Sequence, residues 1–108
     1  MASKEERDYL AQYIDISNAR LSDNDVSLLN DFINNIDSHF ERTTSYDGWS
    51  SDGRYTRTAT NEYIIESDYT ITHNYSYNDD DGQEGSYSTS YSEARDIINI
   101  LKAVPELL

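Results

Sequence analysis

Residues 42–91 of this 108-residue chain have the composition and spacing of β-strands. They are rich in Tyr, Thr, Ser and Ile, which favour the pleated, half-buried surface of a sheet. The alternation is clearest from Tyr69 to Tyr77, where Tyr, Ile and His occupy the odd positions and Thr, Asn and Ser the even ones. Because successive side chains of a strand point to opposite faces, we expect one aromatic face and one polar face.

Three groups of turn-forming residues divide this block, at positions 50–53, near 66–68 and at 78–85. Connections this short join neighbouring antiparallel strands. We therefore expect a four-stranded antiparallel meander. The predicted strands cover residues 43–49, 54–66, 69–77 and 86–91.

Two helices are expected before the strands, over residues 3–19 and 23–41. In the first, Ser3 and Glu6 have the spacing of a capping box. In the second, Ser22 is the expected N-cap, and apolar side chains recur with the helical period. The two patterns together predict a helical N-terminal segment.

A third helix follows the strands, with Ser92 as its expected N-cap and Pro105 as its stop. A block of strands flanked by helices predicts an α+β fold, with two N-terminal helices, the four-stranded meander and one C-terminal helix covering one sheet face. The length fits a single domain over residues 1–108. Only 36% of the residues are hydrophobic, and 10 are Tyr, so we expect a thin core and a Tyr-rich sheet face.

The chain carries 21 acidic and 8 basic residues, a formal net charge of −13. This charge argues against direct binding to nucleic acid or to anionic membrane, since both require a positive surface. The expected partner is a basic protein surface, toward which the negative field steers encounter. Self-repulsion favours a monomer or a small homo-oligomer.

No residue pattern predicts catalysis, a bound metal or a cofactor. Cysteine is absent, which excludes thiolate sites and suits the cytoplasm. His39 is expected near the end of the second helix, and His73 on the Tyr-rich strand face. The run at 79–82 fails as an EF-hand because Tyr77 and Ser88 stand where carboxylates are needed. We interpret it as a solvated acidic turn, with a loose divalent-cation site as the alternative.

Trp49, with Arg54 and Arg57 nearby, has the composition of a binding hot spot. The favoured interpretation is that Trp49 anchors the core. The two arginines have opposite parity in one predicted strand, so we expect them on opposite faces of the sheet.

Small size, a pI near 4.2, the lack of cysteine and Tyr/Asp/Asn-rich strands between helices resemble the acidic, phage-encoded anti-CRISPR proteins that act as DNA mimics. The resemblance is one of composition and layout over the whole chain. It implies inhibition, without catalysis, of a nucleic-acid-binding enzyme in the host cytoplasm. The implied target is a CRISPR effector, blocked at its basic DNA- or PAM-binding surface. The alternative is a small adaptor or assembly protein that binds through its Tyr-rich face.

The partner-binding surface is expected where carboxylates gather at the turns and on the neighbouring strands. The densest group is the predicted hairpin tip at 79–84. The expected partner-binding residues are Asp47, Asp52, Glu62, Glu66, Asp68, Asp79, Asp80, Asp81 and Glu84.

Overall fold

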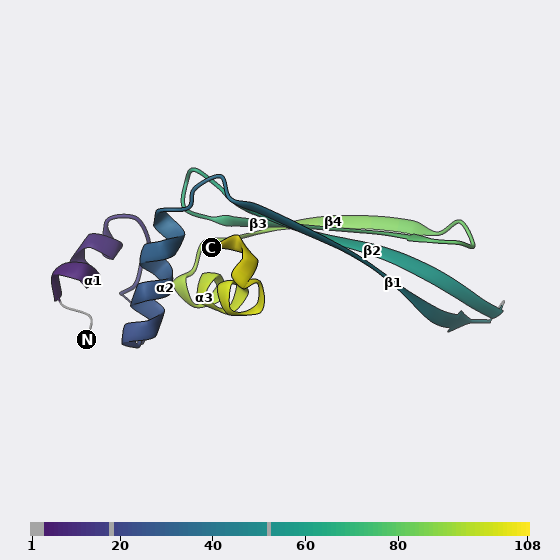
Figure 1. Cartoon of the computed structure of the whole chain (residues 1–108), viewed down its shortest axis with the longest axis horizontal. Coiled ribbons are helices and arrows are strands. Elements are labelled where there is room, and N and C mark those ends of the chain that lie inside the picture. Colours follow the sequence, from purple (N-terminus) through teal and green to yellow (C-terminus); the bar gives the residue numbers. More distant parts are fainter. Residues whose placement is uncertain (1–3, 18, 52) are drawn as a thin grey trace.

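The computed structural model describes residues 4–17, 19–51 and 53–108. It confirms the expected α+β fold, with a four-stranded antiparallel sheet and helices on either side of it in the chain (Figure 1). The elements are α1 (Lys4–Ala11), α2 (Asp23–Ile33), β1 (His39–Ser50), β2 (Gly53–Ile65), β3 (Ile71–Asp79), β4 (Glu84–Tyr91), α3 (Ala94–Ala103) and the 3₁₀-helix η1 (Pro105–Leu107).

The strands lie in the order β1-β2-β3-β4, so the predicted meander is confirmed. Tyr63 of β2 pairs with Phe40 of β1 and His73 of β3, and this register sorts the side chains onto two faces. We call them the aromatic face and the hydroxyl face. The aromatic face carries Phe40, Tyr46, Tyr55, Tyr63, His73, Tyr75, Tyr77, Tyr87 and Tyr91. The hydroxyl face carries Thr43, Ser45, Thr56, Thr58, Thr60, Thr72, Ser76, Ser86, Ser88 and Ser90.

The hydrophobic core lies between the helices and one end of the sheet. Phe32 of α2 and Leu101 of α3 are buried there with Ile65 and Ile71, which pair with each other across β2 and β3. No described Tyr is among the fully buried core residues. The buried core is therefore built from aliphatic side chains and Phe32.

The molecule is a rod of 59 × 23 × 22 Å. Its radius of gyration is 17.5 Å, against about 13 Å for a compact domain of this length. Figure 1 shows the reason: the helices gather at one end of the sheet, and the strands continue past them. We call residues 43–51, 53–60 and 75–87 the sheet arm. No described apolar side chain of the arm belongs to the hydrophobic core or packs against it.

Helix α2 ends at Ile33, so the predicted helix over 23–41 is too long. The side chains of Asn34 and Asn35 donate to the carbonyls of Asn30 and Asp31, at 2.9 and 2.6 Å, and satisfy the last turn. The chain then begins β1 at His39, because pairing with β2 satisfies its backbone groups. His39 is thus a strand residue, and its predicted place near a helix end is wrong.

Smaller differences have local causes. The predicted helix over 3–19 stops at Ala11, and an Asp15–Ser17 turn follows, in which Asp15 accepts from the backbone and hydroxyl of Ser17. Ser22 is the N-cap of α2 as predicted. Glu93, not Ser92, precedes α3, without a capping side-chain bond.

The strands also differ at their ends from the predicted ones. Strand β3 begins at Ile71 instead of 69, because Tyr69 adopts a positive φ of 64° in the preceding turn. Strands β3 and β4 reach closer to each other than predicted, so the connecting turn is residues 80–83. Ser3, expected to cap the first helix, lies outside the described residues.

We expect Phe32→Ala to lower the free energy of unfolding by about 3–5 kcal/mol, because it leaves a cavity in the hydrophobic core that the described residues form. The exposed arm residue Tyr87 is the control, and Tyr87→Ala should cost less than about 1 kcal/mol. Urea unfolding followed by far-UV circular dichroism measures both. Equal losses would contradict the separation of arm and core.

Candidate functional site

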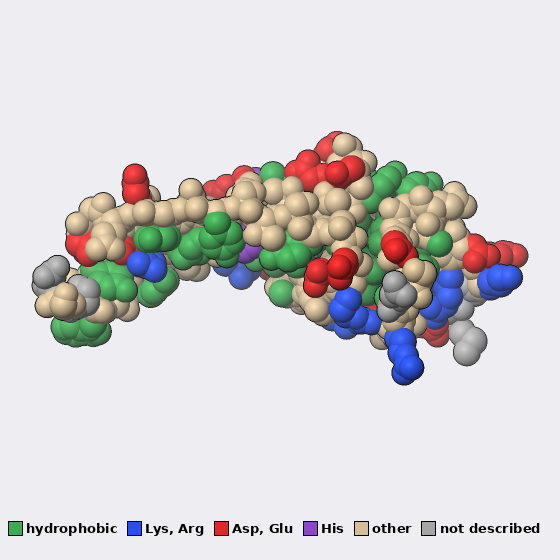
Figure 2. Space-filling model, turned by 180° about the vertical axis from the view of Figure 1, so that it is seen from behind, with side chains coloured by type: hydrophobic (Ala, Val, Ile, Leu, Met, Phe, Trp, Pro, Cys, Tyr) green, Lys and Arg blue, Asp and Glu red, His purple; other side chains and the backbone are tan. Residues whose placement is uncertain are grey.

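Large aromatic side chains remain exposed on the sheet arm. Tyr46 and Tyr87 are about half exposed, and Trp49, near the end of β1, is 78% exposed. In Figure 2, hydrophobic side chains lie along the lower side of the arm. The helices cover the same side of the sheet at its other end (Figure 1). The interpretation of Trp49 as a core anchor is wrong, because the hairpin carries it far beyond the helices.

Two glycines let aromatic rings lie flat against the aromatic face of the arm. Gly48 pairs with Tyr55, and Gly85 pairs with Tyr77. A Cβ atom at Gly48 would stand 2.4 Å from the Tyr55 ring, and one at Gly85 would stand 2.5 Å from the Tyr77 ring. Each ring fills the space of its neighbour's missing side chain. The result is a smooth aromatic surface on a part of the sheet that no helix covers.

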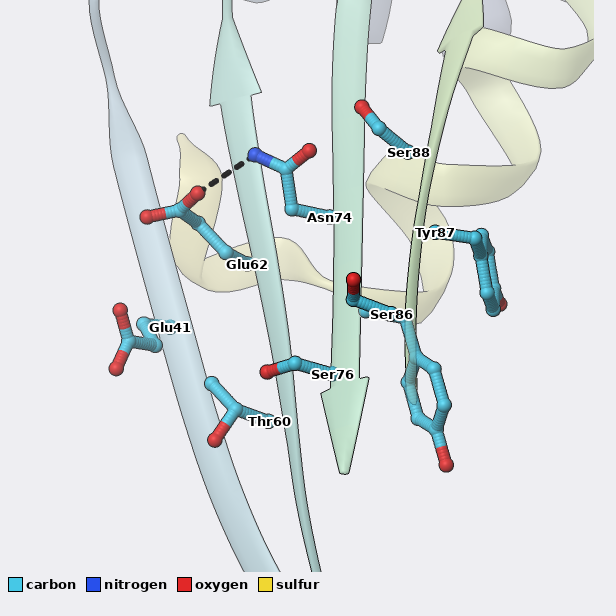
Figure 3. A pocket seen from close by; sticks show the side chains of 9 residues that line it. Glu41, Thr60, Glu62, Asn74, Ser76, Ser86, Tyr87 and Ser88 are labelled. Carbon is cyan, nitrogen blue, oxygen red and sulfur yellow. Dashed lines mark hydrogen bonds between the residues drawn. The ribbon is translucent and has the colours of Figure 1, made fainter. Parts of the chain in front are cut away.

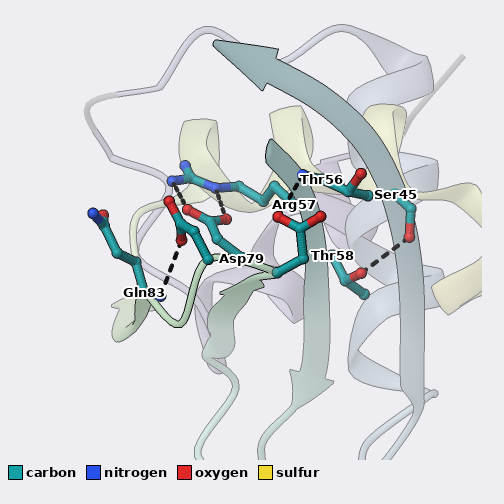
Figure 4. A network of polar contacts seen from close by, with 8 residues as sticks. Ser45, Thr56, Arg57, Thr58, Asp79 and Gln83 are labelled. Atoms are coloured by element: carbon teal, nitrogen blue, oxygen red, sulfur yellow. Dashed lines mark hydrogen bonds and ion pairs between the residues drawn. The ribbon is translucent and has the colours of Figure 1, made fainter. Parts of the chain in front are cut away.

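An ion pair lies at the centre of the arm. Arg57 donates from Nε and Nη2 to the two carboxylate oxygens of Asp79, at 2.7 and 2.9 Å (Figure 4). The guanidinium lies over the rings of Tyr77 and Tyr55, 4.1 and 5.6 Å from their centroids. The Asp79 side chain is only 2% exposed, and Arg57 holds the pKa of Asp79 below its usual value. Asp79 therefore stabilises the arm, and its buried carboxylate is not accessible to a partner.

A second network ties the first hairpin to the second. Asp47 accepts hydrogen bonds from Arg54 and from the Thr56 hydroxyl. The Thr56 amide donates to Asp80 Oδ1, and the Asp80 amide donates back to the Thr56 carbonyl, both at 3.0 Å. Arg54 thus pairs on the opposite face from Arg57, which confirms their predicted opposite orientation.

The predicted partner-binding residues do not form one surface. Asp47, Asp80, Asp81 and Glu84 gather at the outer end of the arm. Glu66 and Asp68 lie beyond the other end of β3, about 30 Å away along nine strand residues. Asp52 lies outside the described residues.

On the hydroxyl face, Glu62 is held by two neighbours. Its Oε1 accepts from Asn74 Nδ2 at 2.7 Å, and its Oε2 lies 2.8 Å from His39 Nε2. The hydrogen bond from Asn74 lowers the pKa of Glu62 most, and the one from His39 lowers it further. Figure 3 shows this carboxylate beside an open hollow. The hollow is lined by Glu41, Thr60, Glu62, Asn74, Tyr75, Ser76, Ser86, Tyr87 and Ser88.

The His39–Glu62 pair was missed in the sequence because the predicted second helix ran through His39. With β1 recognised as starting there, the spacing of His39 and Glu41 would have placed both on one face. His73 lies on the other face, stacked on Tyr63 and bonded to Asn61 at 2.8 Å, and burial lowers its pKa.

Most of the acidic charge stays unbalanced. In the described part of the chain, six Lys and Arg side chains contact only five carboxylates. Asp25 takes two of these contacts, from Arg95 and Lys102, at 3.5 and 3.4 Å. Figure 2 shows acidic side chains both on the arm and over the helical end. The field therefore extends over the length of the rod.

No protein-family model, curated protein or solved structure matches this chain. None of the described helices is long and apolar enough to cross a membrane. The candidate site is therefore defined by geometry: an acidic rod that ends in an aromatic arm.

The Asp79→Asn variant should lose more stability at neutral pH than at acidic pH. Since the folded-state pKa of Asp79 is lowered, its contribution is present above the unfolded pKa, about 3.9, and is lost as the pH falls through the folded value. Urea unfolding at pH 7 and pH 3, followed by Trp49 fluorescence, measures the difference. Asp81→Asn, at the exposed turn, is the control; a pH dependence as large as that of Asp79→Asn would contradict the assignment.

Proposed function

We propose that this chain is a non-catalytic binding protein that occupies the basic nucleic-acid-binding groove of an enzyme and so inhibits it. The observation that carries this proposal is the combination of an elongated rod, 59 Å long, with a net charge of −13. A DNA duplex of that length carries about 35 phosphate charges, and this chain has 21 carboxylates. The length of the rod and its number of negative charges are thus of the order of those of the DNA that such a groove binds.

The placement of the exposed acids supports a broad contact. Asp80, Asp81 and Glu84 lie at the outer end of the arm, while Glu5 and Asp31 lie at the helical end. Charges spread over a long surface steer the encounter with a basic groove more than they strengthen the final complex. The resemblance to acidic anti-CRISPR proteins makes a CRISPR effector the first class of target to test.

A second candidate function is an adaptor that binds through the exposed aromatic side chains of the arm, on its aromatic face and at its tip. Its supporting observations are Tyr46 and Tyr87, about half exposed on the aromatic face, and Trp49, 78% exposed near the arm's tip beside Arg54 on the hydroxyl face. Trp, Tyr and Arg dominate the binding energy of protein interfaces. The two functions differ in their dependence on salt, because carboxylate contacts are screened and aromatic contacts are not.

For the inhibitor, we expect binding to a basic nuclease, tested over a panel of CRISPR effectors, to weaken sharply between 50 and 500 mM salt and to compete with DNA. Substituting Asp80→Asn, Asp81→Asn and Glu84→Gln together should slow association roughly tenfold in surface plasmon resonance. The matched control, Glu5→Gln, Asp8→Asn and Asp31→Asn, changes the same charge at the helical end. Equal effects of the two triple variants would show that both ends of the rod contribute to the encounter. Unchanged association of both variants, or salt-independent binding, would refute the proposal.

For the adaptor, Trp49→Ala should weaken binding roughly tenfold or more, mainly through faster dissociation, and equally at both salt concentrations. Tyr9→Ala is the control, because Tyr9 is exposed on α1, away from the arm. Pull-down from a host lysate at high salt, followed by the same kinetic assay, measures it. Unchanged dissociation of the Trp49→Ala variant would exclude the arm as the contact.

A further inference from the structure

We propose that His39, Glu41 and Glu62 form a binding site for a divalent cation of the zinc type on the hydroxyl face. One ligand atom of each residue lies within 4.8 Å of the other two. The site would be new to this chain and does not rest on the proposed function, since none of its three residues lies on the arm.

Strand geometry brings the three side chains together. His39 and Glu41 are two residues apart on β1, so both point to the same face. Glu62 is the direct partner of Glu41 on β2, and its Oε2 already lies 2.8 Å from His39 Nε2. All three residues stand on paired strands, which hold ligands more precisely than loops do.

The pairing of Glu41 with Glu62 argues for a cation between them. Like charges directly opposite each other on neighbouring strands destabilise a sheet. Glu41 and Glu62 occupy such a pair, and the group beside them is an imidazole. A divalent ion between the two carboxylates would turn this repulsion into attraction.

The neighbours of Glu62 fit the surroundings of a metal ligand. Asn74 donates to Oε1 at 2.7 Å, which fixes the carboxylate and leaves Oε2 directed toward His39. Hydrogen bonds of this kind orient metal-binding carboxylates. Figure 3 shows Glu41 and Glu62 beside the same hollow, which leaves room for the ion and its water.

The donor set selects the class of metal. One imidazole nitrogen and two carboxylate oxygens suit Zn²⁺, which uses three protein ligands and a water in open sites. Ca²⁺ and Mg²⁺ prefer oxygen ligands alone, whereas this set includes an imidazole nitrogen. Ligand atoms around tetrahedral zinc lie about 3.4 Å apart, a separation that falls between the 2.8 Å from His39 to Glu62 and the 4.8 Å limit on the whole set. The ion would connect β1 to β2 where the arm leaves the helices.

The two histidines make a direct test possible. In a titration of the full chain with ZnCl₂, followed by imidazole ¹H–¹⁵N spectra, the His39 signals should shift and saturate at one ion per chain. The His73 signals should stay in place, because His73 lies on the opposite face. Equal shifts of both histidines, or no saturable shift of His39, would overturn the proposal.

Calorimetry with the same salt tests two of the ligands separately. His39→Ala and Glu41→Gln should each weaken zinc binding at least tenfold, while Glu66→Gln, a carboxylate change outside the site, should leave it unchanged. All three side chains lie on the surface or beside it, so circular dichroism can establish that the variants fold. Wild-type affinity in His39→Ala would overturn the site, and CaCl₂ binding as tight as ZnCl₂ binding would overturn its assignment to zinc.

Discussion

The pairing of β1 with β2 over twelve positions is the interaction on which the rest of this structure depends. It sets which side chains share a face, and it makes the sheet longer than the three helices can cover. The core is therefore confined to one end, around Ile65 and Ile71. The remaining length becomes an arm with two solvent-facing sides. Its exposed surfaces, on which both proposed functions depend, exist because the sheet is longer than its helical cover.

An arm without a helical layer needs another source of order, and the Arg57–Asp79 pair supplies it. A buried carboxylate is tolerated only when its charge is compensated and its oxygens are bonded, and both conditions hold here. The rings of Tyr55 and Tyr77 shield the pair and close over two glycines. Polar and aromatic contacts thus replace a core in this half of the sheet.

The two faces divide the possible functions between them. The aromatic face offers contact area through side chains such as Tyr46 and Tyr87, while the unbalanced carboxylates supply a long-range field. These properties are compatible in one binder, because charge accelerates encounter and aromatic contacts slow dissociation. The hydroxyl face adds the proposed zinc site at the base of the arm, where a cation would relieve the opposition of Glu41 and Glu62.

The sequence by itself determined the meander, the aromatic face, the Ser22 cap and the excess of acids, because these depend on local spacing and composition. Tertiary structure decided where α2 ends and β1 begins, since only pairing with β2 makes His39 a strand residue. It also decided that Asp79 is buried while Trp49 is exposed. The burial of a side chain depends on which elements cover its strand and which side chain lies opposite it on the neighbouring strand. Local periodicity of the sequence indicates neither.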